Sequence, residues 1–596
     1  MAKGKISAVK VIFFLTLLFI PAIFDLLKPG YFPMHDDLQI FRLYELDKCV
    51  QDGQLPCRWI PDGGFGYGYP MFHFYPPLPY YPAEVMHLLG VSLFTSIEVM
   101  FILSLLLSGY FMYFLASEFF GTMGGLVAAV FYVYAPYHSL DVYVRGAMNE
   151  AWGMVWFPLI LLFSYKLIKA SKYNRKYFLG LSLSIAALLL SHNIMTMIFA
   201  PVAVIWSLFW FWQKKTWKNL KLLVLGGLLA IGLSAFFFIP VILEKSSVHV
   251  ESITVGYFNY LAHFADLKQM FISRFWDYGS SLWGPDDDMA FPLGHFHWIS
   301  AGIVGLLALF RFKKHKKERR LHLLIGLLLA VSLAYTFLVH SRSVWFWDNL
   351  PILYYTQFPW RLLTIPVFLM SFTAGALFMF IGKEPDSSVI PTGAERSGGI
   401  PLNCKTTSHR DLSTSFHFGR DDKRKILATL LITGVILWNL PFFKMDYPVN
   451  ITREEKLSGW LWELQVTGGI FDYLPKTASR PPGDAGFSIP QFIEGNGGVL
   501  DLKRGSNWTT FTTNVSTENA KLMIPIFGYP GMKVKINNKQ VQYQTDEDLG
   551  RIIIDLNRGV SNISVKLHKT LVRHASDLVS LLSLLVLFKI IYSKNE

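Results

Sequence analysis

The sequence predicts a mainly α, polytopic membrane protein with a C-terminal β domain outside the membrane. Of the 596 residues, 52% are hydrophobic and only 16% are charged, and the mean hydropathy is +0.36. Such a chain is too apolar for a soluble protein of this length. About twelve apolar runs approach the length of a bilayer crossing. The last part of the chain has short stretches of alternating polarity instead, which are typical of β-strands.

The apolar runs predict transmembrane helices of roughly 20 residues each. They lie at 8–28, 95–116, 121–137, 152–168, 177–191, 194–212, 220–242, 296–311, 321–339, 362–382, 425–442 and 574–593. The first run is followed by Lys28-Pro29 and lacks a small-x-small cleavage site, so we interpret it as a span and not as a signal peptide. Several runs are short, which allows about ten to thirteen spans.

The positions of Lys and Arg predict the orientation, because basic loops stay in the cytoplasm. If the chain has about twelve spans, both termini and all the basic segments lie on the same side of the membrane. The basic segments are the N-terminus, 166–176, 214–221, 311–320 and 420–425. The outer side receives 29–94, 138–151, 191–193, 243–295, 340–361 and 443–573. We expect a protein of the plasma membrane. The net charge of +13 is explained by these loops, so we expect no nucleic-acid partner.

The chain divides into membrane and non-membrane parts. We expect a transmembrane domain at 1–382 with a large first outer loop at 29–94, and single spans at 425–442 and 574–596. Residues 383–424 are rich in Pro, Ser, Thr and Gly, which predicts a flexible cytoplasmic loop. Residues 443–573 predict a small extracytoplasmic β-sandwich. Its strands are expected at 508–515, 520–526, 533–536, 541–543, 551–555 and 562–567, with a turn at Asn537-Asn538.

Three cysteines are too few for a disulfide scaffold. Cys49 and Cys57 both lie in the first outer loop, whereas Cys404 lies in the predicted cytoplasmic loop. A disulfide between Cys49 and Cys57 is compatible with an oxidising compartment, and two free thiols are equally compatible with the sequence.

The first outer loop carries the strongest candidate site. Asp36 and Asp37 follow His35 just outside the first span. Adjacent carboxylates beside a membrane cost solvation energy and have no evident packing use, so they indicate binding or reaction. Further ionisable groups in this loop include Arg58 and His73.

Other outer segments add candidates with alternative roles. Glu150 begins a span, where the helix dipole favours a carboxylate, and Arg145 lies just before it. His192 occupies the turn between two spans, where a histidine is more often an interface residue than a catalyst. Arg361 lies at the outer end of a span, where it either extends to the headgroups or binds a phosphate.

Several of these motifs together resemble a known family. The strings are His35-Asp36-Asp37, residues 53–59, 66–70 and 74–78, and Arg145-Gly146 with Glu150. They resemble the integral membrane family labelled 6-pyruvoyl-tetrahydropterin synthase-related, although the chain has no zinc-binding histidine set of a pterin synthase. The membrane region is similar to the GT-C glycosyltransferases, which have a first span, a large outer loop with an acidic residue at its start, and many further spans.

The resemblance implies an enzyme that moves a sugar from a polyprenyl-phosphate donor in the bilayer to a glycan, lipid or protein acceptor outside. Asp36 or Asp37 would be the base that deprotonates or orients the acceptor. Glu150 would share acceptor binding, and Arg145 and Arg361 would face the donor phosphate.

The same resemblance implies secondary contacts and leaves metal use open. Donor or acceptor contacts would come from His35, Arg58, His73, Tyr75 and His192. Mg²⁺ or Mn²⁺, if required, would be held by Asp37 and Glu150.

Two other classes of protein remain open. A lipid or glycan transporter would place its ionisable groups near the middle of the membrane, whereas here they gather at outer span ends. A non-catalytic glycan-binding or assembly protein would use the β domain, but it leaves the aspartate pair unexplained.

Overall fold

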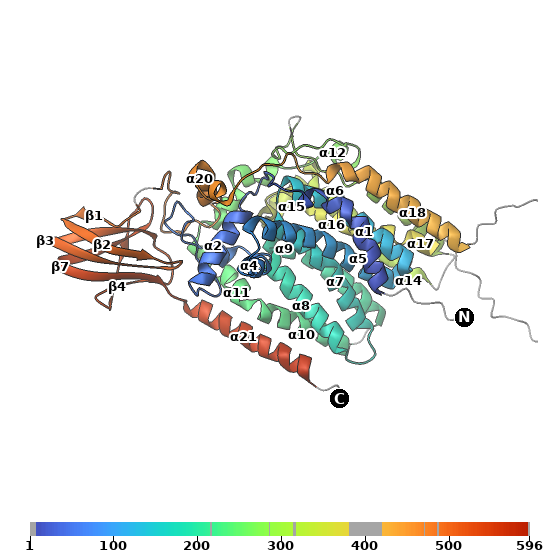
Figure 1. Ribbon diagram of the computed structural model, residues 1–596. Helices are drawn as coiled ribbons and strands as arrows, with labels where there is room; N and C mark the ends of the chain where they lie inside the picture. Colours follow the sequence, from blue (N-terminus) through green and yellow to red (C-terminus); the bar gives the residue numbers. More distant parts are fainter. Residues whose placement is uncertain are drawn as a thin grey trace, which may run out of the picture.

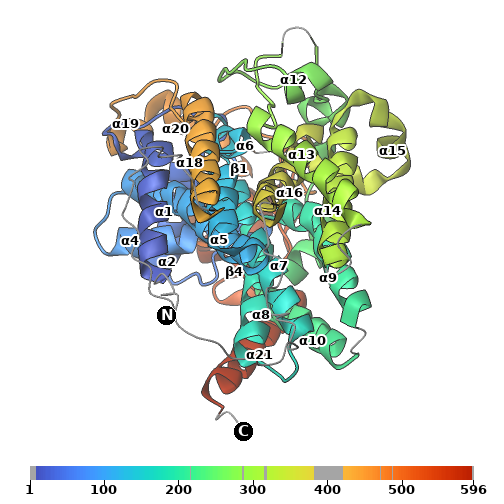
Figure 2. The same cartoon turned by 90° about the vertical axis from the view of Figure 1, so that its right-hand side faces the viewer.

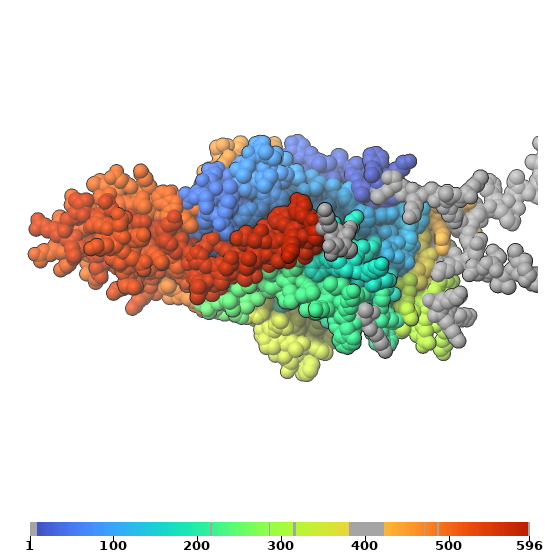
Figure 3. All heavy atoms as spheres, turned by 90° about the horizontal axis from the view of Figure 1, so that it is seen from below, coloured from blue at the N-terminus to red at the C-terminus, as the bar shows by residue number. Residues whose placement is uncertain are grey.

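The computed structural model describes residues 8–214, 217–284, 287–313, 318–380, 420–469, 471–485 and 488–593. It consists of a helical body with a β-sheet at one end, and a C-terminal helix that runs from the sheet back along the body (Figures 1 and 3). The predicted flexible loop at 383–424 lies largely outside the described residues, and so does Cys404.

Helices occupy every range in which a span is predicted. They are α1 (Ala8–Ile23), α5 (Leu93–Val133), α7 (Met148–Lys169), α8 (Arg175–Ser191), α9 (Asn193–Lys214), α10 (Trp217–Leu233), α11 (Ala235–Leu243), α13 (His295–Phe312), α14 (Arg319–Val339), α16 (Thr364–Ala374), α17 (Leu377–Phe380), α18 (Arg420–Asn439) and α21 (Leu571–Tyr592). Within the described chain, eight helical segments are long and apolar enough to span a membrane, or nine if α10 and α11, bent by 81°, form one span. The expected count of about twelve is therefore not confirmed, because elements such as α1 are short.

The segment labelled α5 contains a reversal of the chain. Gly121 has φ +72°, outside the helical region, so the helix breaks there. A Cβ on Gly109 would lie 2.6 Å from Val133, and one on Gly125 would lie 2.9 Å from Ser117. Residues this far apart in sequence meet only if the two arms run antiparallel. The runs predicted at 95–116 and 121–137 are thus the two arms of this hairpin.

Two of the loops expected in the cytoplasm lie together with the end of α21. Asn219 Nδ2 donates to the Ile168 carbonyl at 2.6 Å, and Arg175 Nη1 donates to the Ser593 carbonyl at 2.6 Å. These contacts join 166–176 and 214–221 to the end of α21. The first described residues of α1 and the end of α21 both lie away from the sheet (Figure 1). The compartment on each side stays a prediction.

The segments expected outside the membrane also meet. The first loop folds into α2 (Gln39–Gln51), α3 (Met71–Phe74) and α4 (Tyr80–Leu88), and a Cys49–Cys57 disulfide closes it. Tyr31 pairs with Val449, and Val248 pairs with Pro475. The first loop, the 243–295 segment and the stretch leading to the sheet therefore form one layer over the end of the helical body.

The β region is a single antiparallel sheet of seven strands in the order β1-β3-β7-β4-β5, with β2 beside β3 and β6 beside β7. The strands are β1 (Gln491–Glu494), β2 (Gly497–Arg504), β3 (Trp508–Phe527), β4 (Met532–Ile536), β5 (Lys539–Val541), β6 (Gln544–Thr545) and β7 (Arg551–Leu567). The structure shows one sheet where a small sandwich is predicted, and four of the expected strands are parts of the long strands β3 and β7. These two pair along most of their length. The predicted turn at Asn537-Asn538 is confirmed by φ values of +51° and +67°.

Candidate functional site

The acidic pair of the first loop is attached to the segment before α7. The His35 amide donates to the Val144 carbonyl at 3.1 Å, and the Asp36 amide donates to the Arg145 carbonyl at 2.8 Å. Arg145 follows a π-helical turn, η2 (Leu140–Val144), and such turns are frequent at functional sites. Gly146 has φ +61°, and a Cβ there would overlap Met34, so this approach requires glycine.

Asp36 is held through one carboxylate oxygen. Its Oδ2 accepts from Arg42 Nη1 at 2.8 Å and from Gln39 Nε2 at 3.1 Å. Arg42 also donates to the Tyr75 hydroxyl at 3.0 Å and lies 4.2 Å from the centre of that ring. All hydrogen bonds and ion pairs of the Asp36 side chain within the described residues use Oδ2, and the side chain is 34% exposed.

Asp37 differs because both of its carboxylate oxygens are engaged. Oδ1 accepts from the Tyr31 hydroxyl, and Oδ2 pairs with Lys456 Nζ at 2.6 Å. Lys456 ends α19 (Arg453–Lys456), in the stretch before the sheet. Burial raises the pKa of Asp37, although Lys456 acts in the opposite direction. Asp37 therefore connects the first loop to a residue 419 positions later in the chain.

Glu150 is the centre of a buried charge cluster. Its Oε2 lies 2.9 Å from Arg145 Nη1 and accepts from Arg361 Nε at 2.9 Å. Its Oε1 accepts from the Tyr137 hydroxyl at 2.7 Å. Glu150 is 1% exposed, so the two guanidinium groups compensate its burial. Arg361 is 5% exposed and therefore does not extend to the headgroups.

Further groups surround Glu150. Arg145 also pairs with Asp141 and lies 4.7 Å from the centre of the Trp360 ring. Burial and the neighbouring Glu150 raise the pKa of Asp141 well above its usual range. Burial lowers the pKa of His192 to about 3, against the opposing effect of Glu150, so the imidazole is neutral at pH 7. Its Nδ1 accepts from the Met195 amide at 3.1 Å.

The aromatic run 74–78 connects the two clusters. Asn149 Nδ2 donates to the Pro76 carbonyl at 2.7 Å, and Asn193 Nδ2 donates to the Phe74 carbonyl at 3.1 Å. This run therefore packs on the start of α7 and on the α8–α9 turn, next to Glu150 and His192. Asn149 was not among the predicted site residues, although its position directly before Glu150 was a usable signal.

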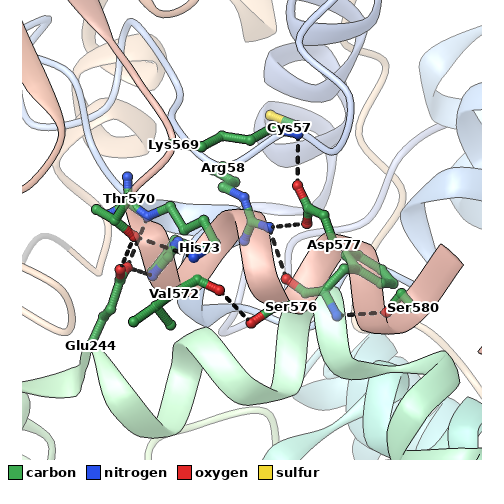
Figure 4. A network of polar contacts seen from close by, with 12 residues as sticks. Cys57, Arg58, His73, Glu244, Lys569, Thr570, Val572, Ser576, Asp577 and Ser580 are labelled. Carbon is green, nitrogen blue, oxygen red and sulfur yellow. Dashed lines mark hydrogen bonds and ion pairs between the residues drawn. The ribbon is translucent and has the colours of Figure 1, made fainter. Parts of the chain in front are cut away.

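Two predicted site residues lie apart from these clusters. Arg58 and His73 belong to a separate network with Glu244 and the start of α21 (Figure 4). The exposed His35 has its Nε2 2.7 Å from the Tyr278 carbonyl, and burial of part of the ring lowers its pKa. The sequence placed Arg58 and His73 near the acidic pair because they share its loop.

The contacts of the proposed metal ligands do not fit a shared metal ion. Asp37 is engaged by Lys456 and Tyr31, and Glu150 by two arginines. Among the described residues, no group of three or more His, Cys, Asp or Glu side chains is arranged to hold a metal. The requirement for Mg²⁺ or Mn²⁺ stays a prediction, and the mechanism proposed below uses no metal.

A small cavity lies beside Arg42, between the first loop and the stretch before the sheet. Its volume is about 20 Å³, which is room for a water molecule. Its polar lining includes Arg42, Tyr69, Tyr75, Asp472 and Tyr473. Burial raises the pKa of Asp472 to about 7.

Part of the chain matches a known family. Residues 75–243 match the model of a family described as dolichyl-phosphate-mannose-protein mannosyltransferase. This stretch includes Arg145, Glu150 and His192. An uncharacterized protein of Lactococcus lactis subsp. cremoris (strain MG1363) is 29% identical over 210 residues, which cover 34% of each chain. The chain thus spans about a third of the length of this curated relative.

Two solved structures show a weak likeness. The arabinofuranosyltransferase AftD from Mycobacteria is 15% identical, with 74% of this chain and 27% of that chain covered and a TM-score of 0.43. ArnT from Cupriavidus metallidurans, bound to undecaprenyl phosphate, is 14% identical, with 62% and 60% covered and a TM-score of 0.36. Both TM-scores are too low for either likeness to carry weight for fold or function.

Proposed function

We propose that this protein is an integral membrane glycosyltransferase that moves a sugar from a polyprenyl-phosphate donor to an acceptor hydroxyl on the side of the sheet. The family match over residues 75–243 supports this class of reaction. The backbone contacts of His35 and Asp36 attach the acidic loop to this same stretch. The acceptor is a hydroxyl of a glycan, lipid or protein, and the membrane is the plasma membrane.

The base in this proposal is Asp36, and the observation that carries it is the difference between the two aspartates. Asp37 uses both oxygens in internal contacts, whereas the contacts of the Asp36 side chain with the described part of the protein use Oδ2 alone. Oδ1 of Asp36 is therefore available to take a proton from an acceptor. Arg42 and Gln39 orient the carboxylate without blocking that oxygen.

The arginines around Glu150 would bind the phosphate of the donor. Within the described chain, the side-chain hydrogen bonds and ion pairs of Arg145 use Nη1, and those of Arg361 use Nε and Nη1. Each guanidinium thus keeps a further nitrogen for a phosphate oxygen. Glu150 holds both groups in fixed orientations, which is the condition for stabilising developing charge.

The acceptor oxygen forms a bond to the anomeric carbon of the sugar, and its proton passes to Asp36. The bond between that carbon and the phosphate oxygen breaks, and its electron pair leaves with the polyprenyl phosphate. Arg145 and Arg361 stabilise the negative charge of this leaving group.

The test compares Asp36→Asn with Asp37→Asn in membranes supplied with labelled polyprenyl-phosphate hexose. We expect Asp36→Asn to lower transfer by roughly 10²-fold or more, because an amide cannot act as the base. Asp37→Asn is the matched control, because it removes the neighbouring negative charge and leaves the proposed base intact. This variant should retain most of the transfer rate, although its contact with Lys456 is weakened.

Two outcomes would contradict the proposal. Full activity of Asp36→Asn, with wild-type expression and membrane insertion, would exclude the residue as base. Absence of transfer by the wild-type protein with every polyprenyl-phosphate hexose and membrane acceptor supplied would reject the glycosyltransferase function itself.

A further inference from the structure

The C-terminal helix reaches into the first loop through a buried polar network (Figure 4). Arg573, in the first turn of α21, donates from Nε to Glu244 Oε2 at 2.8 Å. The same oxygen lies 2.9 Å from His73 Nε2. Glu244 follows α11, and His73 belongs to α3. One carboxylate therefore joins the last span, the bent α10–α11 pair and the first loop.

This network is buried and is held at more than one point. His73 and Arg573 are each 1% exposed, and Glu244 is 9% exposed. Burial alone would raise the pKa of Glu244, but its contacts with His73, Thr570 and Arg573 lower it to about 2, so it is charged at pH 7. Removal of Arg573 would leave this buried carboxylate without its cation, which is costly.

The network leads to the proposed base through a single helical turn. His73 lies in α3, which spans only Met71–Phe74, and the Tyr75 amide closes this turn on the Met71 carbonyl at 2.7 Å. The Tyr75 hydroxyl accepts from Arg42, and Arg42 holds Asp36. In so short a helix, a shift of His73 moves Tyr75 as well.

The same helix is continuous with the sheet. β7 ends at Leu567, and α21 begins at Leu571. The Arg573 guanidinium lies 5.2 Å from the ring centre of Tyr529, a residue of the loop between β3 and β4. Arg573 therefore connects three parts, which are the sheet, the last span and the first loop.

We infer that Arg573 is a positioning residue for the transfer reaction, acting through Glu244, His73 and Tyr75 on the Arg42–Asp36 pair. The sheet and α21 then form part of the catalytic arrangement and are more than a membrane anchor. This inference rests on the proposed function, because it assigns a purpose to the orientation of Asp36.

The test is a double-mutant cycle of Arg573→Met and Tyr75→Phe. We expect each change to lower kcat roughly tenfold with KM for the donor unchanged, because the base is displaced by a fraction of an ångström. The kcat of the double variant should fall by about the same factor as in either single variant, and not by the product of the two factors, since both changes interrupt one chain of contacts. Arg573→Lys, which keeps the charge beside Glu244, should recover part of the rate.

The matched control is Arg175→Met, which removes an arginine contact at the opposite end of α21. Arg175 Nη1 donates to the Ile590 and Ser593 carbonyls at 3.2 and 2.6 Å. This variant loosens the same helix without touching the network, so kcat should stay at the wild-type value. An equal loss in Arg175→Met would overturn the inference, and so would a multiplicative loss in the double variant.

Hydrogen exchange separates this inference from the proposed function. In the substrate-free protein, amides of residues 71–75 should exchange faster in Arg573→Met and at the wild-type rate in Arg175→Met. Unchanged exchange at 71–75 in Arg573→Met would show that the network does not hold α3. If wild-type protein transfers no sugar while this exchange difference is found, the proposed function fails and the structural coupling stands.

Discussion

Glu150 illustrates how this protein places charges inside a largely apolar body. Its side chain receives two guanidinium groups and a phenol, all from segments at the same end of the helices. Removing one partner of such a cluster leaves an uncompensated buried charge, which typically costs about 3–5 kcal/mol. The cluster is thus both a structural requirement and a rigid frame for the arginines.

The stability of the protein should depend on pH through His73. Burial lowers the pKa of His73 to about 4 from its usual 6.5, with Arg573 and Arg58 adding to this effect and Glu244 opposing it. In the unfolded chain the imidazole binds a proton near pH 6.5, whereas in the folded protein it stays neutral down to about pH 4. Stability is therefore fully present above pH 6.5 and is lost as the pH falls toward 4, by up to about 3 kcal/mol.

The measurement is the thermal midpoint of the detergent-solubilised protein at pH 7.5 and pH 4.5. We expect a smaller acid-induced decrease for His73→Gln than for the wild type, since glutamine does not titrate. An identical decrease in both proteins would show that other groups cause the acid sensitivity.

The contacts of the candidate site residues were only partly predictable from the sequence. The sequence singled out the acidic pair, Glu150 and the two arginines as candidates because charges at span ends are rare. The sequence did not distinguish Asp36 from Asp37, because the distinction depends on Lys456, a residue 419 positions away. Arg58 and His73 were placed near the acidic pair because loop membership does not specify which neighbours a side chain faces.

At the scale of elements, glycines allow close helix contacts. A Cβ on Gly124, in the second arm of α5, would lie 2.7 Å from the Gly375 carbonyl oxygen. A Cβ on Gly375, which follows α16, would lie 2.6 Å from the Gly124 carbonyl oxygen. Backbone faces backbone at this crossing, so a side-chain movement alone cannot relieve the overlap.

Gly124→Ala and Gly375→Ala should therefore each destabilise the protein by about 1–3 kcal/mol through overpacking. Thermal unfolding in detergent measures the effect. Gly227→Ala is the matched control, because nothing lies within 4 Å of the added methyl group on α10. Equal midpoints for all three variants would show that the α5–α16 contact is not tight.

Helices were predicted better than strands, for a physical reason. A membrane helix needs a long apolar run, and each such run became a helix. Strands were predicted from short alternating windows, so β3 and β7 were divided where their pairing is irregular, near residues 515–519 on β3. β1 and β2 escaped prediction because their residues are mostly exposed and show no buried alternation.

At the scale of the whole molecule, the two ends of the helical body differ. One end carries the acidic pair, the Glu150 cluster and the sheet, and the other carries the basic loops with the start of α1 and the end of α21 (Figure 2 shows the helical body from this second end). This polarity agrees with the distribution of Lys and Arg.

The orientation can be checked with single cysteines in a Cys404→Ser background. Lys539→Cys, at the start of β5, should react with a membrane-impermeant maleimide on intact cells. Lys172→Cys, between α7 and α8, should react only after permeabilisation. The opposite labelling pattern would place the acidic pair in the cytoplasm and would remove the case for a lipid-linked donor.

The contacts between residues far apart in the sequence also affect the order in which the protein can fold during its synthesis. During synthesis, the first loop emerges long before α19 and α21, so Asp37 lacks Lys456 and Glu244 lacks Arg573 until late in translation. Domains usually fold in the order in which they are synthesised. Here the earliest outer segment acquires its final contacts only when the last described helix has inserted, so a prematurely terminated chain would carry an incomplete site.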